Sequence, residues 1–511
     1  MTRRSGSIAV GATIGLVSAV VTIGVAQLAA GIVNPQASPI FVVGQSVIDA
    51  TPEWLKAFAI RAFGERDKTV FLAGIGAVLI VLAVVLGTAS LRRPWVGIAG
   101  LAVLGLIGVV TALTRPTARA VDALPAIAAV AAGAVMLEIL LPSEGRDAKA
   151  GDADGWRIDR RRFLLTGAAG VVAAVAAGGV GNALVRRFNA DGSRAMVSIP
   201  GPASRASPLP AGTELEVAGL DPFITPNDRF YRVDTALLVP GLRAEDWRVR
   251  VHGMVEREVV LGYEQLLARP LIERDITLTC VSNPIGGRYV DNARWIGARL
   301  KDLLEEAEPH PGADQIVSRS VDGFTIGTPT AIAMDGRDAM LAVAMNGEPL
   351  PLEHGFPVRM IVPGLYGYVS ATKWLIDIEL TTFDAYDPYW IERGWAERGP
   401  VKTMSRIDTP TPSLDLRTGE VPIAGVAWAP HVGIDRVEVS IDDGPWQAAE
   451  LAAEDTIDTW RQWAYWWDAT PGEHPLRVRA ADRGGATQTS VRSEPFPDGA
   501  TGHHEIVVHV T

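Results

Sequence analysis

The sequence of 511 residues contains a single cysteine, Cys280, and this scarcity sets the first limits on its chemistry. A lone thiol forms no disulfide within the chain, and zinc or iron–sulfur sites built from several cysteines are excluded by count. A basic surface for nucleic acid is also missing, because the net charge is −11. Cys280 is therefore a small buried side chain, a catalytic nucleophile, or the single thiolate ligand of a metal whose other ligands come from a cofactor.

Histidine is also scarce, and the first one in the chain is His252. A b-type haem held by two histidines within an N-terminal membrane region is therefore excluded. Most of the histidines show no spacing typical of a zinc site, and they are expected to be structural or exposed. These are His252, His310, His431, His474, His503, His504 and His509.

Long apolar runs fill about the first 185 residues, at about 8–33, 69–86, 96–113, 124–141 and 163–184. Each run can supply the ~17–25 apolar residues that cross ~30 Å of hydrocarbon. Five transmembrane helices are therefore predicted. Buried helices of a soluble core are the alternative, but five such runs in succession are rare in soluble proteins.

Basic residues near the ends of these runs predict the orientation. On one side lie Arg3, Arg4, Arg92, Arg93, Arg146, Lys149, Arg157, Arg160, Arg161 and Arg162. They outnumber those of the other side, which are Lys56, Arg61, Arg66, Lys68, Arg115 and Arg119. The positive-inside rule makes the richer side cytoplasmic. An odd number of crossings then predicts a multi-pass protein of the cytoplasmic membrane, with everything after the fifth helix on the extracytoplasmic side.

The fifth apolar run begins with Asp159-Arg160-Arg161-Arg162-Phe163-Leu164-Leu165. This segment looks like a twin-arginine export signal placed inside the chain. An ordinary basic anchor before a membrane helix is the alternative, and the residues leave both open. A twin-arginine signal would imply that the following domain is exported already folded, as a cofactor inserted in the cytoplasm requires.

After residue 190 the pattern changes to that of a multi-domain globular region. A stretch rich in Pro, Ser, Gly and Ala, at about 198–213, separates it from the membrane part. Short β-branched and aromatic runs follow, mixed with helical stretches, which predicts an α+β fold. The strands are expected at 247–251, 276–280, 358–362 and 374–380, and the helices at 263–267 and 300–306.

The last hundred residues read as all-β. Strands are expected at 421–428, 434–441, 447–451, 461–467, 474–481 and 505–510. Many short strands separated by Gly- and Asp-containing turns predict an immunoglobulin-like sandwich without its disulfide. The predicted organisation is a transmembrane anchor over 1–190, a linker over 191–213, a catalytic α+β domain over 214–408 and the sandwich over 409–511.

Two stretches carry the strongest indication of chemistry. The first runs from Cys280 to Asn283 and continues through Gly286-Gly287 to 292–297; the second covers 345–359 and 362–374. Together they resemble the sulfite oxidase family of molybdopterin-dependent oxidoreductases. The resemblance extends from about residue 226 to the C-terminus, so that the sandwich resembles the dimerisation domain of that family.

This resemblance implies a molybdenum–molybdopterin cofactor (Mo-MPT) with Cys280 as the protein ligand of the metal. A soft thiolate suits molybdenum that is already held by the two sulfurs of a pterin dithiolene. Cationic side chains and backbone donors suit the phosphate of the pterin. The segment 227–232 also matches, by position, the first turn that contacts the cofactor in that family, which implies Tyr231 and Arg232 as cofactor-binding residues. The second stretch implies His354, Arg359, Ser370, Thr372 and Lys373.

The sequence also departs from the family. Sulfite oxidases follow their cysteine with Ala-Gly-Asn-Arg-Arg, whereas here the nearest following arginine is Arg288, and Val233 stands where another arginine is expected. A sulfite dianion would lose charge-assisted hydrogen bonds of ~1.5–3 kcal/mol each. Weak binding of sulfite is therefore expected, with Asn283, Arg288 and Tyr289 orienting a less charged oxo-compound beside Cys280.

Two functions from different classes remain. The first is a membrane-anchored, extracytoplasmic oxidoreductase that transfers an oxygen atom to or from a small oxo-compound. The second is a membrane-tethered binding protein whose sulfite-oxidase-like fold has lost its metal. The joint presence of Cys280, His354, Arg359 and Lys373 favours the enzyme. Its expected partners are the small oxo-substrate, membrane lipid, an electron-transfer partner and a second copy of the chain, and the direction of catalysis stays open.

Overall fold

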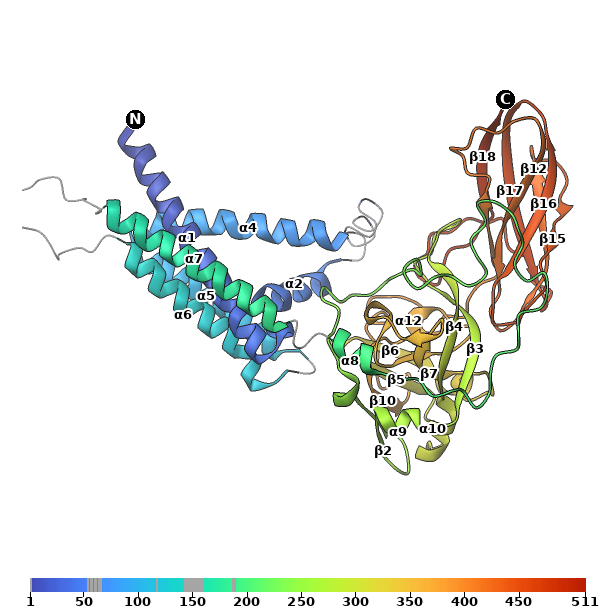
Figure 1. Cartoon of the computed structure of the whole chain (residues 1–511), viewed down its shortest axis with the longest axis horizontal. Helices are drawn as coiled ribbons and strands as arrows, with labels where there is room; N and C mark the ends of the chain where they lie inside the picture. Colours follow the sequence, from blue (N-terminus) through green and yellow to red (C-terminus); the bar gives the residue numbers. More distant parts are fainter. Residues whose placement is uncertain are drawn as a thin grey trace, which may run out of the picture. The chain divides into compact units, whose positions relative to one another are not determined.

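The computed structural model describes residues 2–52, 67–115, 118–141, 160–185 and 190–511, together with Leu55, Phe58 and Ala62. The chain forms two compact units. The first comprises residues 1–189 and 235–241, and the second comprises 190–234 and 242–511. Figure 1 shows the helices of the first unit in blue to green and the sheets of the second in green to red.

The first unit is helical, as predicted. Its helices are α1 (Thr2–Val33), α2 (Pro39–Ala50), α4 (Asp67–Ser90), α5 (Pro94–Leu113), α6 (Leu124–Leu140) and α7 (Arg160–Val185). All but α2 are long and apolar enough to cross a membrane. The short apolar helix α2 was not predicted. Of the basic and flanking residues used above, Lys56, Arg61, Arg66, Arg146, Lys149, Arg157 and Asp159 lie outside the described residues.

Glycine allows α1 to pack closely against its neighbours. A Cβ atom at Gly15 would overlap the carbonyl oxygen of Ala83 in α4, and one at Gly24 would overlap that of Ala174 in α7. Ile14 of α1 is fully buried in a cluster with Leu137 and Leu140 of α6. Small residues at such contacts let helix backbones approach, which is the usual basis of helix packing in membranes.

The second unit begins with two sheets that share one hydrophobic core, which confirms the predicted α+β class. One sheet has the order β3-β4-β7-β8, with β9 paired to β7; the other has the order β2-β1-β10-β5-β6. The first consists of β3 (Leu271–Thr279), β4 (Val290–Arg299), β7 (Met340–Met345), β8 (Glu348–Pro349) and β9 (Arg359–Ile361). The second consists of β1 (Arg248–Gly253), β2 (Val259–Gly262), β5 (Gln315–Ser320), β6 (Thr325–Pro329) and β10 (Leu375–Thr381).

Short helices connect these strands. They are α9 (Tyr263–Leu267), α10 (Leu300–Ala307), α11 (Thr330–Ala333) and α12 (Gly367–Ser370). Trp247, Trp295 and Phe356 are the large, fully buried side chains of the shared core. Since Trp295 lies on β4 and Phe356 lies just before β9, the core directly underlies the segments that contain the two motifs.

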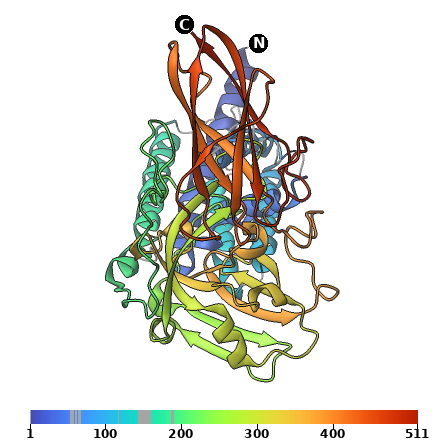
Figure 2. The ribbon, with the colours of Figure 1, turned by 90° about the vertical axis from the view of Figure 1, so that its right-hand side faces the viewer.

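The C-terminal part of the second unit is a sandwich of two four-stranded antiparallel sheets, drawn in orange and red in Figure 2. One sheet has the order β11-β12-β16-β15 and the other β14-β13-β17-β18. Side chains from both sheets, such as Ile423 and Leu476, pack in one core. The strands are β11 (Met404–Thr409), β12 (Gly419–Trp428), β13 (Ile434–Ile441), β14 (Gln447–Ala448), β15 (Glu450–Leu451), β16 (Arg461–Ala469), β17 (Gly472–Asp482) and β18 (His504–Val510).

Two details of the sandwich correct the sequence-based description. The single strand expected at 447–451 divides, because β14 pairs with β13 in one sheet and β15 pairs with β16 in the other. Strand β11 was not predicted and belongs to the sandwich, although it lies mostly before the expected boundary at 409.

The segment expected as a linker, 191–213, belongs to the second unit. It begins with α8 (Asp191–Met196), where Arg194 Nε donates to the carbonyl oxygen of Leu350 at 2.9 Å. Farther on, Ala203 N donates to Leu271 O and Glu273 N donates to Ser204 O, both at 2.8 Å. The linker therefore runs beside β3 and pairs with the outer edge of the sheet.

Candidate active site

Cys280 directly follows β3 and opens a tight loop that ends at Tyr289. Cys280 N donates to Tyr289 O at 2.9 Å, and Asn283 N donates to Cys280 O at 3.1 Å. The side-chain oxygen of Asn283 accepts from Tyr289 N at 2.9 Å. Asn283 is only 6% exposed, so this side chain holds the two arms of the loop together. The segment 280–289 is called the thiol loop below.

Cys280 is a free cysteine, and the residue as a whole is partly exposed. Burial raises its pKa, while hydrogen bonding from Ser282 and the positive charge of Lys373 oppose that rise. Tyr231 and Tyr366 are close enough that a thiolate at Cys280 raises the pKa of both phenols, beyond the effect of their burial. Both phenols therefore stay protonated near neutral pH, and a thiolate here needs added positive charge to form.

Arg359 supplies a buried positive charge. It begins β9 and is 5% exposed. Nη1 donates to His354 O at 3.2 Å, and the guanidinium carbon lies 5.1 Å from the centroid of the Trp295 ring. Nε is buried and has no partner in the described chain. Burial lowers the pKa of Arg359 to about 10. A buried guanidinium without a carboxylate partner is costly unless an anion pairs with it.

Two further cations, Lys373 and Arg232, face Asp234. Lys373 Nζ and Arg232 Nε both donate to Asp234 Oδ2 at 2.8 Å. Lys373 also donates to Glu353 O at 3.1 Å, and burial lowers its pKa to about 8 against the pull of Asp234. Partial burial favours a lower pKa for Arg232, but its bond to Asp234 outweighs this and raises it. Two cations thus share one buried carboxylate, which leaves net positive charge.

His354 is held as a neutral ring. It ends the short helix η6 (Leu352–His354) and is 5% exposed. Nε2 lies 3.1 Å from Asn227 O, and because a carbonyl only accepts, Nε2 carries the proton. Burial, together with the charges of Arg359 and Lys373, lowers the pKa of His354 to about 4. The ring therefore adds a polar group but no charge near neutral pH.

Aromatic contacts connect the segments of the site. Phe230 lies 5.3 Å from Tyr231, 5.7 Å from Trp295 and 5.5 Å from His354, measured between ring centroids. The rings of Tyr231 and Tyr289 are 6.3 Å apart. Tyr231 N donates to Asp291 Oδ2 at 2.6 Å, which ties the turn that contains Tyr231 to β4. Phe230 thus joins three chain segments that are far apart in the sequence.

Three of the predicted site residues are placed differently from the rest. Arg288 is exposed and makes no hydrogen bond or ion pair within the described chain. Ser370 is fully buried, and its hydroxyl lies 3.1 Å from Leu365 O and 3.0 Å from Tyr366 O. The hydroxyl of Thr372 lies 2.5 Å from that of Ser318. The hydroxyls of Ser370 and Thr372, expected to face the cofactor, therefore bind within the protein around α12.

Some residues of the site escaped prediction. Asp234 neutralises part of the cationic cluster, and Asp291 holds the turn at Tyr231 with a pKa that burial raises to about 7. Arg406 of β11 reaches the thiol loop, where Nη1 donates to Gly287 O at 3.0 Å. A signal for this residue exists, since Arg406 and Asp408 are two positions apart in a strand and so share one face.

Part of the chain is similar to known proteins. A family model described as an oxidoreductase molybdopterin binding domain matches residues 236–390. The mitochondrial sulfite oxidase of Homo sapiens is 31% identical over 313 residues, which cover 51% of this chain and 56% of that protein. The uncharacterized oxidoreductase YuiH of Bacillus subtilis is 34% identical over 153 residues, which cover 30% of this chain and 74% of that one.

A solved structure shows the same fold. The sulfane dehydrogenase SoxCD from Paracoccus pantotrophus aligns with a TM-score of 0.50 and 24% identity, over 57% of this chain and 84% of that one. The chain spans about half the length of the sulfite oxidases it matches, 56% in the human protein. The family match spans residues 236–390 and so includes Cys280, His354, Arg359 and Lys373. The chain belongs to the sulfite oxidase family of molybdopterin-binding oxidoreductases.

Proposed function

We propose that this protein is a membrane-anchored molybdenum oxidoreductase that transfers an oxygen atom to or from a small oxo-compound on the extracytoplasmic side. Arg359 carries the proposal. Its buried guanidinium has an unpartnered Nε and no carboxylate partner in the described chain, so the fold contains a positive charge suited to an anion. The phosphate of a pterin cofactor is such an anion.

The residues present fit the cofactor. Arg359 and Lys373 would pair with its phosphate, His354 and Tyr231 would border the pterin, Arg232 would support Lys373 through Asp234, and Cys280 would ligate the metal. When bound, the group supplies a molybdenum centre that exchanges an oxygen atom and two electrons with the substrate. The protein itself holds the thiol loop, adds positive charge that favours the thiolate, and keeps His354 neutral.

Metal content tests this proposal directly. The full chain, produced in cells that make the cofactor, should contain about one molybdenum and one pterin per chain. Cys280→Ser should leave the melting temperature of the cofactor-free chain nearly unchanged, because Ser is small and the site is partly exposed, but should abolish turnover. A wild-type chain without molybdenum would refute the enzyme and favour the binding protein.

The substrate is proposed to carry little charge. Arg288 is the one arginine of the thiol loop, but it is exposed and has no partner among the described residues, and Asn283 is occupied in closing the loop. Of the three residues proposed to orient substrate, Asn283 is thus engaged within the loop, and Arg288 is the exposed cation. Steady-state kinetics with sulfite, sulfoxides and N-oxides, using an artificial electron carrier, will test this. Sulfite oxidation with kcat/KM of about 10⁶ M⁻¹s⁻¹ or above would show that charge is not limiting.

The location is proposed from the five apolar helices and from the distribution of basic residues. A reporter fused after Thr511 should be active only outside the cytoplasm. The stretch Arg160-Arg161-Arg162 at the start of α7 is proposed as a twin-arginine signal. Replacing Arg160 and Arg161 with Lys should then block export of the loaded domain. Unimpaired export would instead support an ordinary basic anchor.

The C-terminal sandwich is proposed to be immunoglobulin-like and to support self-association, as the family's dimerisation domain does. Of its tryptophans, Trp428, Trp460, Trp463 and Trp467 are buried, whereas Trp466 is 50% exposed. Trp463 and Trp467 lie in the core of the sandwich, whereas Trp428 and Trp460 pack in a separate cluster with Phe223 and Val290. Most of the aromatic surface is therefore buried within the protein itself. The mass of the full chain in detergent, measured by sedimentation, should be that of a dimer, and a monomer at micromolar concentration would contradict self-association. The electron-transfer partner is proposed to be a separate protein or membrane carrier.

A further inference from the structure

The thiol loop rests against the C-terminal sandwich at consecutive residues. Arg406 Nη1, from β11, donates to Gly287 O at 3.0 Å. Gly286 lies against His504 of β18, so closely that a Cβ atom on the glycine would overlap the imidazole ring. Ile285 lies against Gly502, where its Cδ1 would be 2.8 Å from a Cβ atom. Residues 285–287 therefore have the sandwich as their support.

Arg406 is itself fixed on several sides. It is 3% exposed, its Nε donates to Asp408 Oδ1 at 2.5 Å, and its Nη2 donates to Asp221 Oδ2 at 2.7 Å. The planar guanidinium has its donors in a rigid fork, so two carboxylates fix the direction of the third donor. That third donor is Nη1, and it points at Gly287 O. The thiol loop is thus held by a buried arginine of the sandwich, whose own position is fixed by Asp408 and Asp221.

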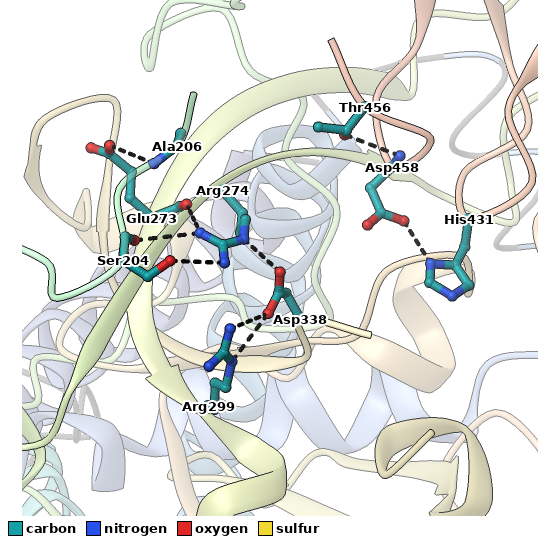
Figure 3. A network of polar contacts seen from close by, with 9 residues as sticks. All are labelled: Ser204, Ala206, Glu273, Arg274, Arg299, Asp338, His431, Thr456 and Asp458. Carbon is teal, nitrogen blue, oxygen red and sulfur yellow. Dashed lines mark hydrogen bonds and ion pairs between the residues drawn. The ribbon is translucent and has the colours of Figure 1, made fainter. Parts of the chain in front are cut away.

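The same domain also supports the strand before the loop. Thr277 N of β3 donates to Asp458 O at 2.9 Å, and Trp460 N donates to Thr277 Oγ1 at 2.7 Å. Figure 3 shows Asp458 beside His431, with which it forms a 2.9 Å contact, and shows Ser204 of the linker beside Glu273 of β3. The outer edge of β3 is therefore held by the linker at one end and by the sandwich near Cys280.

We propose that Arg406 is a positioning residue for Cys280, with His504 as a second support, so that the C-terminal sandwich sets the geometry of the thiol that would ligate the metal. This assigns the sandwich a part in the active site besides packing and self-association. The role of Cys280 as a ligand rests on the proposed function. The mechanical claim, that the sandwich holds the thiol loop, does not depend on it.

The unique cysteine makes this claim measurable, because a thiol reagent reports on Cys280 alone. The full chain is produced in cells that cannot make the pterin, and its alkylation by iodoacetamide is followed at fixed pH and temperature. Arg406→Lys keeps the charge near Asp408 but lacks the fork that reaches Gly287 O. Loss of one charge-assisted hydrogen bond should loosen the loop and speed alkylation about tenfold, since ~1.4 kcal/mol is a factor of ten.

Two further variants make the test decisive. Asp221→Asn weakens one side of the Arg406 frame from a partly exposed position, and it should speed alkylation by a smaller factor without unfolding the domain. Arg461→Lys is the matched control, because Arg461 also donates to carbonyl oxygens of the sandwich but does not contact the thiol loop. Its alkylation rate should equal that of the wild type.

Alkylation rates within twofold of the wild type in Arg406→Lys and Asp221→Asn would overturn the proposal. If Arg406→Lys fails to melt cooperatively, the rate of Asp221→Asn decides alone. The proposed function is judged separately, by the molybdenum content of the wild-type chain from cofactor-producing cells. A molybdenum-free wild type whose thiol loop still loosens in the two variants would refute the enzyme and keep the positioning role.

Discussion

Arg359→Met removes a buried positive charge that no carboxylate of the described chain pairs with. Burial lowers the pKa of Arg359 from 12.5 to about 10. Since each pKa unit corresponds to 1.36 kcal/mol, keeping this side chain charged costs the cofactor-free fold about 3 kcal/mol. That cost is fully present below pH 10 and disappears only as the pH rises towards the unfolded value of 12.5.

The variant also loses favourable contacts. The hydrogen bond from Nη1 to His354 O and the contact with the Trp295 ring are together worth about 2–3 kcal/mol. Arg359→Met should therefore leave the stability of the cofactor-free chain unchanged or raise it by ~1 kcal/mol. The affinity of the chain for the cofactor should instead fall about 100-fold, because the phosphate loses its buried charge partner.

Arg406→Met is the matched control. Both arginines are almost completely buried, at 5% and 3% exposure, but Arg406 is paired with Asp408 and Asp221. Their charges outweigh burial and raise the pKa of Arg406. Its removal leaves Asp408 buried without its partner and should cost ~3–5 kcal/mol. Thermal melting of the cofactor-free full chain in detergent measures both variants. A loss of more than ~2 kcal/mol in Arg359→Met would refute the view that its charge is unpaired.

His354, whose pKa burial lowers to about 4, should make the cofactor-free chain less stable as the pH falls from ~6.5 to about 4, because only the unfolded state then gains the proton. His354→Gln should flatten this part of the curve of melting temperature against pH, and an unchanged slope would contradict the low pKa. Gly15→Leu should separate α1 from α4, so that the full chain elutes as a broad, heterogeneous peak in size-exclusion chromatography. Gly74→Leu, at a position on α4 that faces open space, should leave the peak unchanged. Gly286→Ala should destabilise the chain more than Gly312→Ala, since both glycines have positive φ but only Gly286 lacks room for a Cβ atom; equal losses would mean that backbone strain alone acts.

Elements with a strong local pattern were predictable. The helix at 263–267 and the strand at 434–441 have the expected bounds, and each predicted apolar run lies within one of the long helices, apart from Leu141, which directly follows α6. Strand β11 was missed because Arg406 and Asp408 are buried where an alternating pattern leads one to expect apolar side chains. The division of 447–451 was missed because a chain that changes sheets has the same local sequence as a continuous strand.

The residues of the site also divide into those that the sequence predicts and those that it does not. Cys280, His354, Arg359 and Lys373 could be named from motifs, because their residue types and order are specific. The directions of the Ser370 and Thr372 hydroxyls could not be predicted. Ser370, at the end of α12, bonds back to Leu365 O, and Thr372, just after the helix, contacts Ser318 of β5. The contact from Arg406 to Gly287 joins residues 119 positions apart, and nothing local in the sequence specifies it.

The support of the thiol loop by β18 also has a consequence for biosynthesis. During translation Cys280 leaves the ribosome long before His504, and domains generally fold as units in the order of synthesis. Until β18 has paired with β17, residues 285–287 lack the contact with His504 that supports them. A nascent, stalled or truncated chain therefore presents a loosely held thiol and an incomplete receptor for the pterin. Cofactor insertion would then discriminate between finished and unfinished molecules, so that loading itself would act as a checkpoint on the folding of the sandwich.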